Sequence, residues 1–428
     1  MIQHDIQASR GTSGSALFDE RGDVVAVHNA ATIDETASNR FAIRVDLVRE
    51  LLSDIGLGRI AAIDPSQPPT PNVAGEPNDT FAQADVVSFD SGGVARLEGT
   101  VESLADLDVF LLGALSAGDR ILVDADTTGS NLDVSVALFD DQQRLVYAND
   151  DRTTSFRFLD SYLDWIVRHT SSAYYLVVTG SGFATAGTET GDYEVAVEVT
   201  SGFAVPEPTG QILLLDFDGA VIDTPGLGSI VLDSFDAADI DSVYRGETQV
   251  IKDAIRSFMA ADFAAFDITI VTTDDPPLPA GTEFSSVFFG GRNVNAFGLS
   301  ESVDLYNVDF CDDAVIFTES FSPALFSQIP TAAELSVAIA NVASHEAGHI
   351  LGLNHVTDDL ALMDDQSTTD ALLVDQRFQQ APLSPDVMSI GTQDSVLLLL
   401  ETVGPQLDAV YKYVADRLAD AWKPSVGR

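Results

Sequence analysis

A short stretch near residue 350 has the residue types and the spacing of a metal centre. His345, Glu346 and His349 lie within two turns of a predicted helix, and His355 follows six residues later. On a helix, two histidines four residues apart project from the same face and can bind one metal ion. Gly352 comes next, where a residue without Cβ can adopt a positive φ, end the helix and bring His355 to that ion.

This residue set indicates a catalytic zinc site rather than a structural one. Three neutral imidazoles, from His345, His349 and His355, leave the fourth zinc position open for water. Glu346 lies between the two helical ligands and can take a proton from that water. We therefore predict one catalytic Zn²⁺ and hydrolysis by a zinc-activated water with Glu346 as general base. The alternatives are a chance arrangement and a metal site without catalysis.

The residues before the motif predict a genuine helix. Pro330 precedes Thr331, and Thr331 with Glu334 forms the sequence pattern of a capping box. Leu335, Ile339 and Val342 then repeat at the spacing of one buried helical face.

The pattern H-E-x-x-H-x-x-G-x-x-H resembles the metzincin zinc metallopeptidases. That family has a methionine turn beneath the zinc, and residues 361–364 fit it, with Met363 as the methionine and Met388 as the rival. The resemblance covers about residues 209 to 400 and implies cleavage of protein or peptide substrates. Val356 follows the third histidine and matches none of the better-known groups, so the subfamily and the cleavage preference stay open.

The predicted elements of this region, residues 209–404, suit an α+β catalytic domain with a mixed sheet and a zinc-binding active-site helix. A helix is expected over 248–263 with Ile251, Ile255 and Phe258 on its buried face. Strands are expected over 211–216, 266–273, 284–289 and 313–318, and the composition of 266–273 favours burial on both faces. By the metzincin resemblance, residues 295–299 would lie near the edge strand that pairs with an extended substrate.

The region of residues 74–200 has short β-rich runs at regular spacing, which predicts an all-β sandwich. The expected strands span 109–112, 120–124, 134–139, 174–179 and 193–199. The opening E-P-N-D-T at 76–80 and the closing G-D-Y at 191–193 resemble the bacterial pre-peptidase C-terminal (PPC) domain, an accessory module of secreted peptidases. Proline-rich linkers are expected at 63–73 and 201–208.

Two further features of this region bear on metal binding. Asp124, Asp126 and Asp133 could hold Ca²⁺, although turn and strand-end carboxylates are the favoured interpretation. His169 has no metal-ligand partner at suitable spacing and is expected on the surface.

Residues 1–62 resemble the C-terminal part of a trypsin-like serine protease domain. The stretch 11–18, G-T-S-G-S-A-L-F, would place Ser13 at the nucleophile position, with the backbone amides of Gly11 and Ser13 as oxyanion hole. In that family the histidine and the aspartate precede the serine. We therefore interpret residues 1–62 as a truncated remnant of a partial β-barrel with a vestigial nucleophile, or alternatively as an unrelated β-rich stretch.

The composition limits the partners. The formal net charge is −46, from 67 acidic and 21 basic residues. Such a surface repels nucleic acids and anionic membranes, and no segment has the length of a membrane span. The acidity suits either a solvated coat or a set of calcium sites. The single cysteine, Cys311, excludes an intrachain disulfide and is expected to be buried.

Two functional hypotheses follow. The leading one is a secreted zinc endopeptidase, whose export signal is absent here because the N-terminus is expected to be truncated. The alternative is a catalytically silent cell-envelope adhesion or scaffold protein with a residual zinc site. Residues 405–428 are expected to form a C-terminal helix and tail.

Overall fold

The computed structural model describes residues 71–406, except 128, 152–159, 225 and 366–367, and four strands near the N-terminus. Those strands, β1 (Ile2–His4), β2 (Ala16–Phe18), β3 (Val24–Ala31) and β4 (Arg40–Arg44), form one sheet in the order β1-β4-β3-β2. Ser13, Gly11 and the helix expected near the C-terminus lie outside the described residues. The chain divides into two compact units. The first comprises Met1–Thr70 and Phe89–Val94, and the second comprises Pro71–Ser88 and Ala95–Arg428.

The second unit contains two five-stranded sheets, in the orders β11-β10-β13-β8-β6 and β12-β9-β14-β7-β5. Each strand expected between 109 and 199 is present, most of them longer than predicted. Alternation explains the layers, since Tyr193, Val195 and Val197 of β14 are buried and the residues between them are not. The bounds are β5 (Asn72–Val73), β6 (Asp85–Val86), β7 (Val94–Val101), β8 (Asp108–Leu115), β9 (Arg120–Asp126), β10 (Val134–Phe139), β11 (Leu145–Asn149), β12 (Tyr162–Ile166), β13 (Ser171–Gly180) and β14 (Gly191–Thr200).

A mixed sheet follows in the chain, in the order β18-β15-β19-β21-β20. β15 (Gln211–Asp216), β18 (Ile268–Thr272), β19 (Ser285–Phe289) and β21 (Asp313–Ile316) are parallel, and β20 (Gly298–Ser300) pairs antiparallel with β21. The expectation that 266–273 is buried on both faces is wrong. β18 lies at the edge of the sheet and is only partly buried. β-Branched residues suit such a half-buried surface as well. Two small hairpins complete the strands, β16 (Ala220–Thr224) with β17 (Gly228–Leu232), and β22 (Gln380–Pro382) with β23 (Thr392–Asp394).

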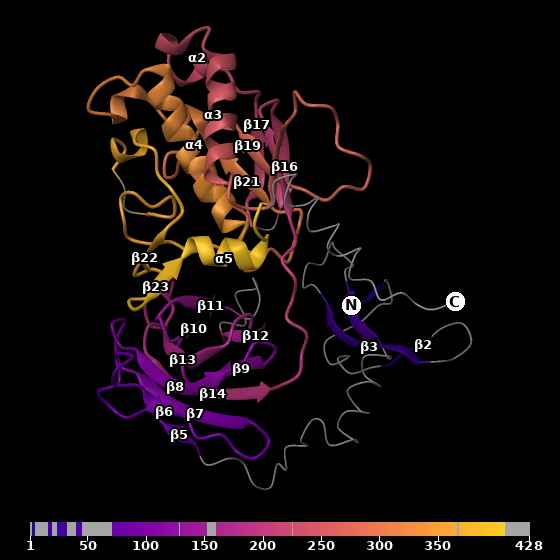
Figure 1. Ribbon diagram of the computed structural model, residues 1–428, viewed down its shortest axis with the longest axis vertical. Coiled ribbons are helices and arrows are strands. Elements are labelled where there is room, and N and C mark those ends of the chain that lie inside the picture. Colours follow the sequence, from indigo (N-terminus) through magenta and orange to yellow (C-terminus); the bar gives the residue numbers. More distant parts are fainter. Residues whose placement is uncertain are drawn as a thin grey trace, which may run out of the picture. The chain divides into compact units, whose positions relative to one another are not determined.

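Two long helices cover the mixed sheet (Figure 1). They are α3 (Thr248–Asp262) and α4 (Ala332–His349), and shorter helices are α2 (Ala237–Ile240) and α5 (Ser395–Thr402). The capping box of α4 is confirmed, because Thr331 accepts a hydrogen bond from the Glu334 amide and the Glu334 carboxylate accepts one from the Thr331 amide. Single 3₁₀ turns span Ser242–Tyr244, Thr318–Ser320, Pro323–Leu325 and Ala371–Leu373.

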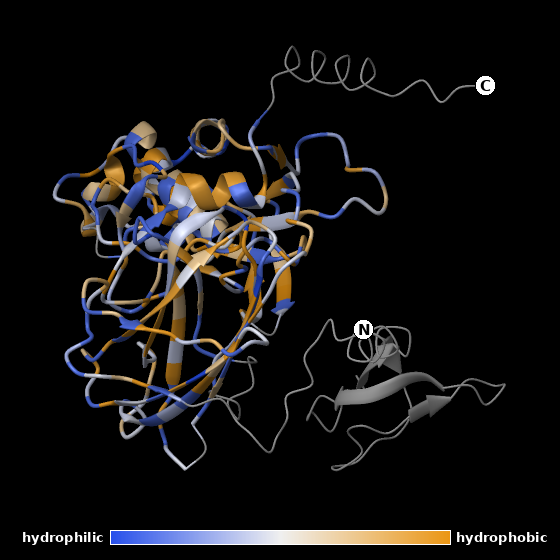
Figure 2. Ribbon diagram, turned by 60° about the horizontal axis from the view of Figure 1, so that its bottom comes forward, coloured by the Kyte–Doolittle hydropathy of each residue, from blue (hydrophilic) through white to orange (hydrophobic). Residues whose placement is uncertain are grey.

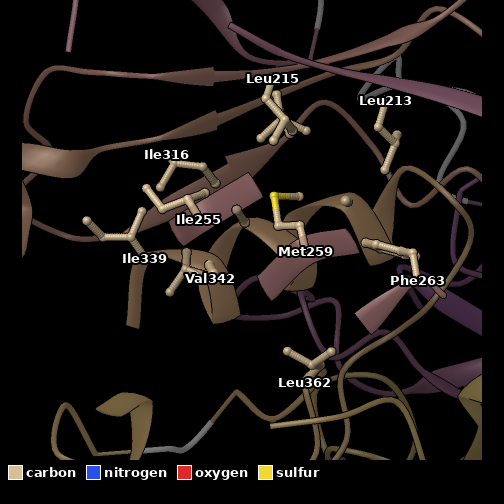
Figure 3. Close-up of a cluster of buried hydrophobic side chains, with 14 of the residues drawn as sticks. Leu213, Leu215, Ile255, Met259, Phe263, Ile316, Ile339, Val342 and Leu362 are labelled. Atoms are coloured by element: carbon tan, nitrogen blue, oxygen red, sulfur yellow. The ribbon is translucent and has the colours of Figure 1, made fainter. Parts of the chain in front are cut away.

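The core of this helical region lies between the sheet and the two helices. Figure 3 shows Met259 of α3 among side chains from β15, β21 and α4. Ile251 and Ile255 are buried as predicted, but Met259, not Phe258, is the third fully buried residue of the stripe. Phe258 packs at its margin. In Figure 2 the hydrophobic residues gather along the helices and strands, and the connecting loops are largely hydrophilic.

The sandwich packs directly against the helical region within the second unit. Leu383 and Met388 belong to the same buried cluster as Phe139, Leu145 and Val177 of the sandwich. Figure 1 shows α5 and the β22–β23 hairpin beside these strands. Hydrogen bonds cross the boundary as well, including one of 2.9 Å from the Tyr306 hydroxyl to the Val146 carbonyl and one of 2.8 Å from Arg168 to the Glu401 carbonyl.

Two sequence predictions about single residues are wrong. Cys311 is exposed and lies in a turn, where its backbone amide donates a hydrogen bond to the Asp309 side chain. The neighbouring Asp312 is buried instead. His169 is only partly exposed and lies between Glu401 and Asp140. Among the described residues, no helix is long and apolar enough to cross a membrane.

Candidate metal centre

The three histidines of the motif converge on one point. His349 Nε2 lies 3.0 Å from His345 Nε2 and 3.1 Å from His355 Nε2. Helix α4 supplies the first two from one face, and the chain then turns back at Gly352, which has φ +94°. A Cβ on Gly352 would lie 2.8 Å from the Leu305 Cα, so both its conformation and its surroundings require glycine.

The other ring nitrogen of each histidine has its own hydrogen-bond acceptor. The acceptors are Leu362 O at 2.7 Å from His345 Nδ1, Leu353 O at 2.8 Å from His349 Nδ1, and Asp386 Oδ2 at 2.9 Å from His355 Nδ1. An acceptor at Nδ1 keeps the hydrogen on that nitrogen and leaves the Nε2 lone pair free. Three lone pairs therefore face one another at about hydrogen-bond distance, an arrangement that a cation stabilises.

The electrostatics of the histidines favour neutral rings in α4. Burial, with His355 nearby, lowers the pKa of His345 to about 4, and burial places the pKa of His349 well below its usual value. Burial also lowers the pKa of His355, but the hydrogen bond and the charge of Asp386 outweigh it, so the pKa of His355 is raised.

Glu346 is almost completely buried beside this cluster. Burial raises its pKa to about 8, partly offset by His355. Its carboxylate lies against Gly298 of the edge strand β20, where a Cβ would come within 2.6 Å of Glu346 Oε1. Gly298 therefore leaves the space that the carboxylate occupies. The predicted edge segment 295–299 overlaps β20, but the sequence pattern did not indicate that Gly298 leaves space for the Glu346 carboxylate.

The two candidate methionines have different surroundings. Met363 is buried beside α4, and a Cβ on Gly348 would lie 2.5 Å from its Sδ. The Met363 carbonyl accepts a hydrogen bond of 2.9 Å from the Val356 amide, next to His355. Met388 instead packs against the sandwich. The structure thus places Met363, not Met388, beside the helix that carries His345 and His349.

Asp386 is the residue of this site that sequence analysis missed. It follows His355 by 31 residues, in the segment 383–388 that is packed against the sandwich. Its hydrogen bond with His355 lowers its pKa to about 2. A second carboxylate, Asp365, lies close enough to complete a group with His355 and Asp386. A carboxylate after a loop of this length has no local spacing signal, so only the folded chain reveals it.

The alternative of a calcium site at Asp124, Asp126 and Asp133 has no support in the geometry of these three residues. Among the described residues, Asp124, Asp126 and Asp133 do not form a group whose ligand atoms lie within 4.8 Å of one another, whereas Glu76, Asp79 and Asp106 do. Asp133 is buried at the start of β10, and burial with the charges of Asp151 and Asp150 raises its pKa to about 6.

Comparisons with known proteins give only weak likenesses. No family model and no curated protein matches the chain. Among solved structures, a zinc-dependent peptidase from Methanocorpusculum labreanum is 12% identical, with 39% of this chain and 93% of that chain covered and a TM-score of 0.25. Archaemetzincin from Methanopyrus kandleri is 16% identical, with 46% and 98% covered and a TM-score of 0.23. A periplasmic inhibitor of g-type lysozyme, PliG from Aeromonas hydrophila, is 16% identical, with 31% and 100% covered and a TM-score of 0.22. Similarities of this size decide neither family nor activity.

Proposed function

We propose that this chain is a zinc-dependent endopeptidase of the metzincin type. The observation that carries the proposal is the convergence of three imidazole Nε2 atoms, each freed by a hydrogen bond at Nδ1, beside a buried carboxylate. His345, His349 and His355 would hold the zinc, and Glu346 would be the general base.

The donor set fits zinc. Two nitrogen ligands of a tetrahedral zinc lie about 3.3 Å apart at the usual Zn–N distance, close to the 3.0 and 3.1 Å between the imidazole nitrogens. Neutral imidazoles with an acceptor at the second nitrogen are typical zinc ligands. When bound, zinc supplies a Lewis acid that acidifies water and polarises a carbonyl group.

Glu346 supplies the proton transfers. Its carboxylate takes a proton from the attacking water and then gives a proton to the nitrogen of the leaving amine. Burial raises the pKa of Glu346 to about 8, because removal from water disfavours the charged carboxylate. An apolar site excludes competing water and strengthens the electrostatic interactions within it.

The edge strand β20 gives the substrate a place to bind. Among the described strands, it is the last of the mixed sheet and pairs on one side only, with β21. An extended peptide can add to such an edge through backbone hydrogen bonds. Because Gly298 of β20 contacts Glu346, a peptide paired with this strand would lie beside the general base.

The test combines metal analysis with cleavage of an unfolded protein. We expect about one zinc per chain, and loss of that metal with activity on chelation. The substitution Glu346→Gln should retain the zinc and lower cleavage by about 10²–10⁴-fold.

Glu283→Gln is the matched control, because this exposed glutamate lies in the loop before β19, and it should cleave like the unsubstituted protein. Full activity of Glu346→Gln would overturn the assignment of the base. Stoichiometric zinc without cleavage of any peptide would instead favour the silent scaffold protein.

A further inference from the structure

A pocket of about 320 Å³ opens beside the metal centre and is lined by both halves of the second unit. His349, His355 and Asp386 contribute from the helical region. Asp150 and Ser181 contribute from the sandwich. A volume of this size is at the lower end of small-ligand pockets. The sandwich is therefore a wall of the space in front of the candidate metal site.

This wall is held in place by tight packing. Gly182, which follows β13, lies so close to the segment 383–388 that a Cβ would come within 2.2 Å of the Asp386 carbonyl oxygen. Met388, two residues later, is buried in the sandwich cluster. The segment 383–388 thus contains both Asp386, which binds His355, and Met388, which packs against the sandwich. The position of Asp150 relative to His355 is consequently set by a packed interface.

The sandwich wall carries an acidic residue, Asp150, with further carboxylates close to it. Asp150 accepts a hydrogen bond of 3.3 Å from the Ser181 hydroxyl. The Ser181 amide donates to the Asp133 carbonyl at 2.8 Å, which brings Asp133 next to this pair. The pKa of Asp133 is raised to about 6 by burial and then by the charges of Asp151 and Asp150. A cation beside these carboxylates would offset the repulsion that helps to raise the pKa of Asp133.

The remaining lining combines apolar walls with the polar residues Ser135, Asn149 and Asn354. Ala148 of the sandwich and Val303, Leu305 and Val387 of the helical region form apolar walls, and among the residues that the structure describes no lysine or arginine lines the pocket. Apolar walls with the Asp150 carboxylate among the lining residues fit a long side chain with an aliphatic stem and a positive tip. A metal ion fits less well, because Asp133, Asp150 and Asp151 are not among the groups of described residues whose ligand atoms lie within 4.8 Å of one another.

We infer that the sandwich makes the active site selective for a lysine or arginine side chain next to the scissile bond, which Asp150 binds through its carboxylate. This inference rests on the proposed peptidase function. It gives the sandwich a direct part in substrate recognition.

The experiment uses the full zinc-loaded chain and matched peptides that differ at one position beside the cut. Lysine, norleucine and glutamate at that position have similar stems and different charges. We expect kcat/KM to be about tenfold higher for lysine than for norleucine, as one partly screened charge pair would give. Asp150→Asn should lower this ratio severalfold, and Asp150→Lys should reverse it while cleavage of the norleucine peptide persists.

Glu102→Gln removes the same charge from an exposed loop of the sandwich outside the pocket, so it separates a local contact from the general acidity of the chain. It should leave the ratio unchanged. Equal kcat/KM for lysine and norleucine in the unsubstituted protein, or an unchanged ratio in Asp150→Lys, would overturn the inference and leave the peptidase proposal standing.

Binding of the same peptides to Glu346→Gln measures the pocket without turnover. Stronger binding of the lysine peptide, lost in the double variant with Asp150→Lys, supports the inference even if no peptide is cleaved. Equal binding of all three peptides counts against it.

Discussion

Two histidines lie where the sandwich meets the helical region, and each binds a carboxylate through Nδ1. His355 Nδ1 lies 2.9 Å from Asp386 Oδ2, and His169 Nδ1 lies 2.8 Å from Glu401 Oε1. Their second nitrogens differ. His169 Nε2 faces another carboxylate, Asp140, at 3.4 Å, whereas His355 Nε2 faces the Nε2 atom of another imidazole, that of His349, at 3.1 Å.

The environment of the second nitrogen decides what each ring can do. Between two carboxylates, His169 is stabilised as a cation, and the interactions with Asp140 and Glu401 raise its pKa to about 9 despite burial. It is a charged link between sandwich and helix α5. His355 has one carboxylate to fix its orientation and a lone pair directed at two other rings, which suits a metal ligand. A histidine–carboxylate contact thus links two elements at His169, whereas at His355 it fixes a ring whose second nitrogen suits a metal ligand.

The largest expected effect is on zinc binding and cleavage when His355 is replaced. His355→Ala should lose zinc affinity and lower peptide cleavage on the order of 10³-fold, because one of three ligands is removed. The metal-free protein should unfold at a temperature close to that of the metal-free unsubstituted chain, since the ion pair of His355 with Asp386 lies within the helical region and does not link it to the sandwich. Zinc titration, cleavage rate and thermal unfolding measure the three quantities, and a large drop in the unfolding temperature would erase the contrast with His169.

A smaller effect is expected at the partner of His355. Asp386→Asn keeps the shape and loses the charge that orients the ring, so zinc affinity should fall by about 10–100-fold. Competition with a chelator of known affinity measures the change. Asp365→Asn is the matched comparison, because Asp365 accepts its hydrogen bond of 2.7 Å from Ser384, and its effect should be smaller. If the two substitutions weaken binding equally, Asp386 has no special role as a positioning residue.

The smallest effect concerns stability at His169. His169→Gln should reduce the free energy of unfolding by about 1–3 kcal/mol, the usual range for hydrogen bonds to charged groups, and should leave zinc content and cleavage unchanged. The folded pKa of about 9 lies above the usual 6.5. The contribution of His169 is therefore complete below about pH 6.5 and is lost as the pH rises through 9.

Chemical denaturation at pH 6 and pH 9.5 measures this dependence. The difference between the unsubstituted protein and His169→Gln should be large at pH 6 and small at pH 9.5. A difference that is independent of pH would show that His169 is not held as a cation.

Local patterns predicted much of the fold around these sites. The capping box at Thr331 and the apolar spacing after it predicted α4, because caps and helical periodicity act within a few residues. Short β-rich runs at regular spacing, with polar turns between them, predicted β10 over residues 134–139 with the same bounds as the structure. The edge position of β18 was not predictable in this way, since a strand's neighbours in a sheet are chosen by distant parts of the chain.

By itself, the sequence determined that three histidines and a glutamate share one helix and the turn after it, because helical spacing and a glycine at positive φ are local properties. Only the tertiary structure decided that Asp386 orients His355, that Gly298 leaves room for Glu346, and that Asp150 of the sandwich lines the same pocket. Those partners are separated by tens to hundreds of residues. Such contacts arise from packing between elements, and no spacing along the chain encodes them.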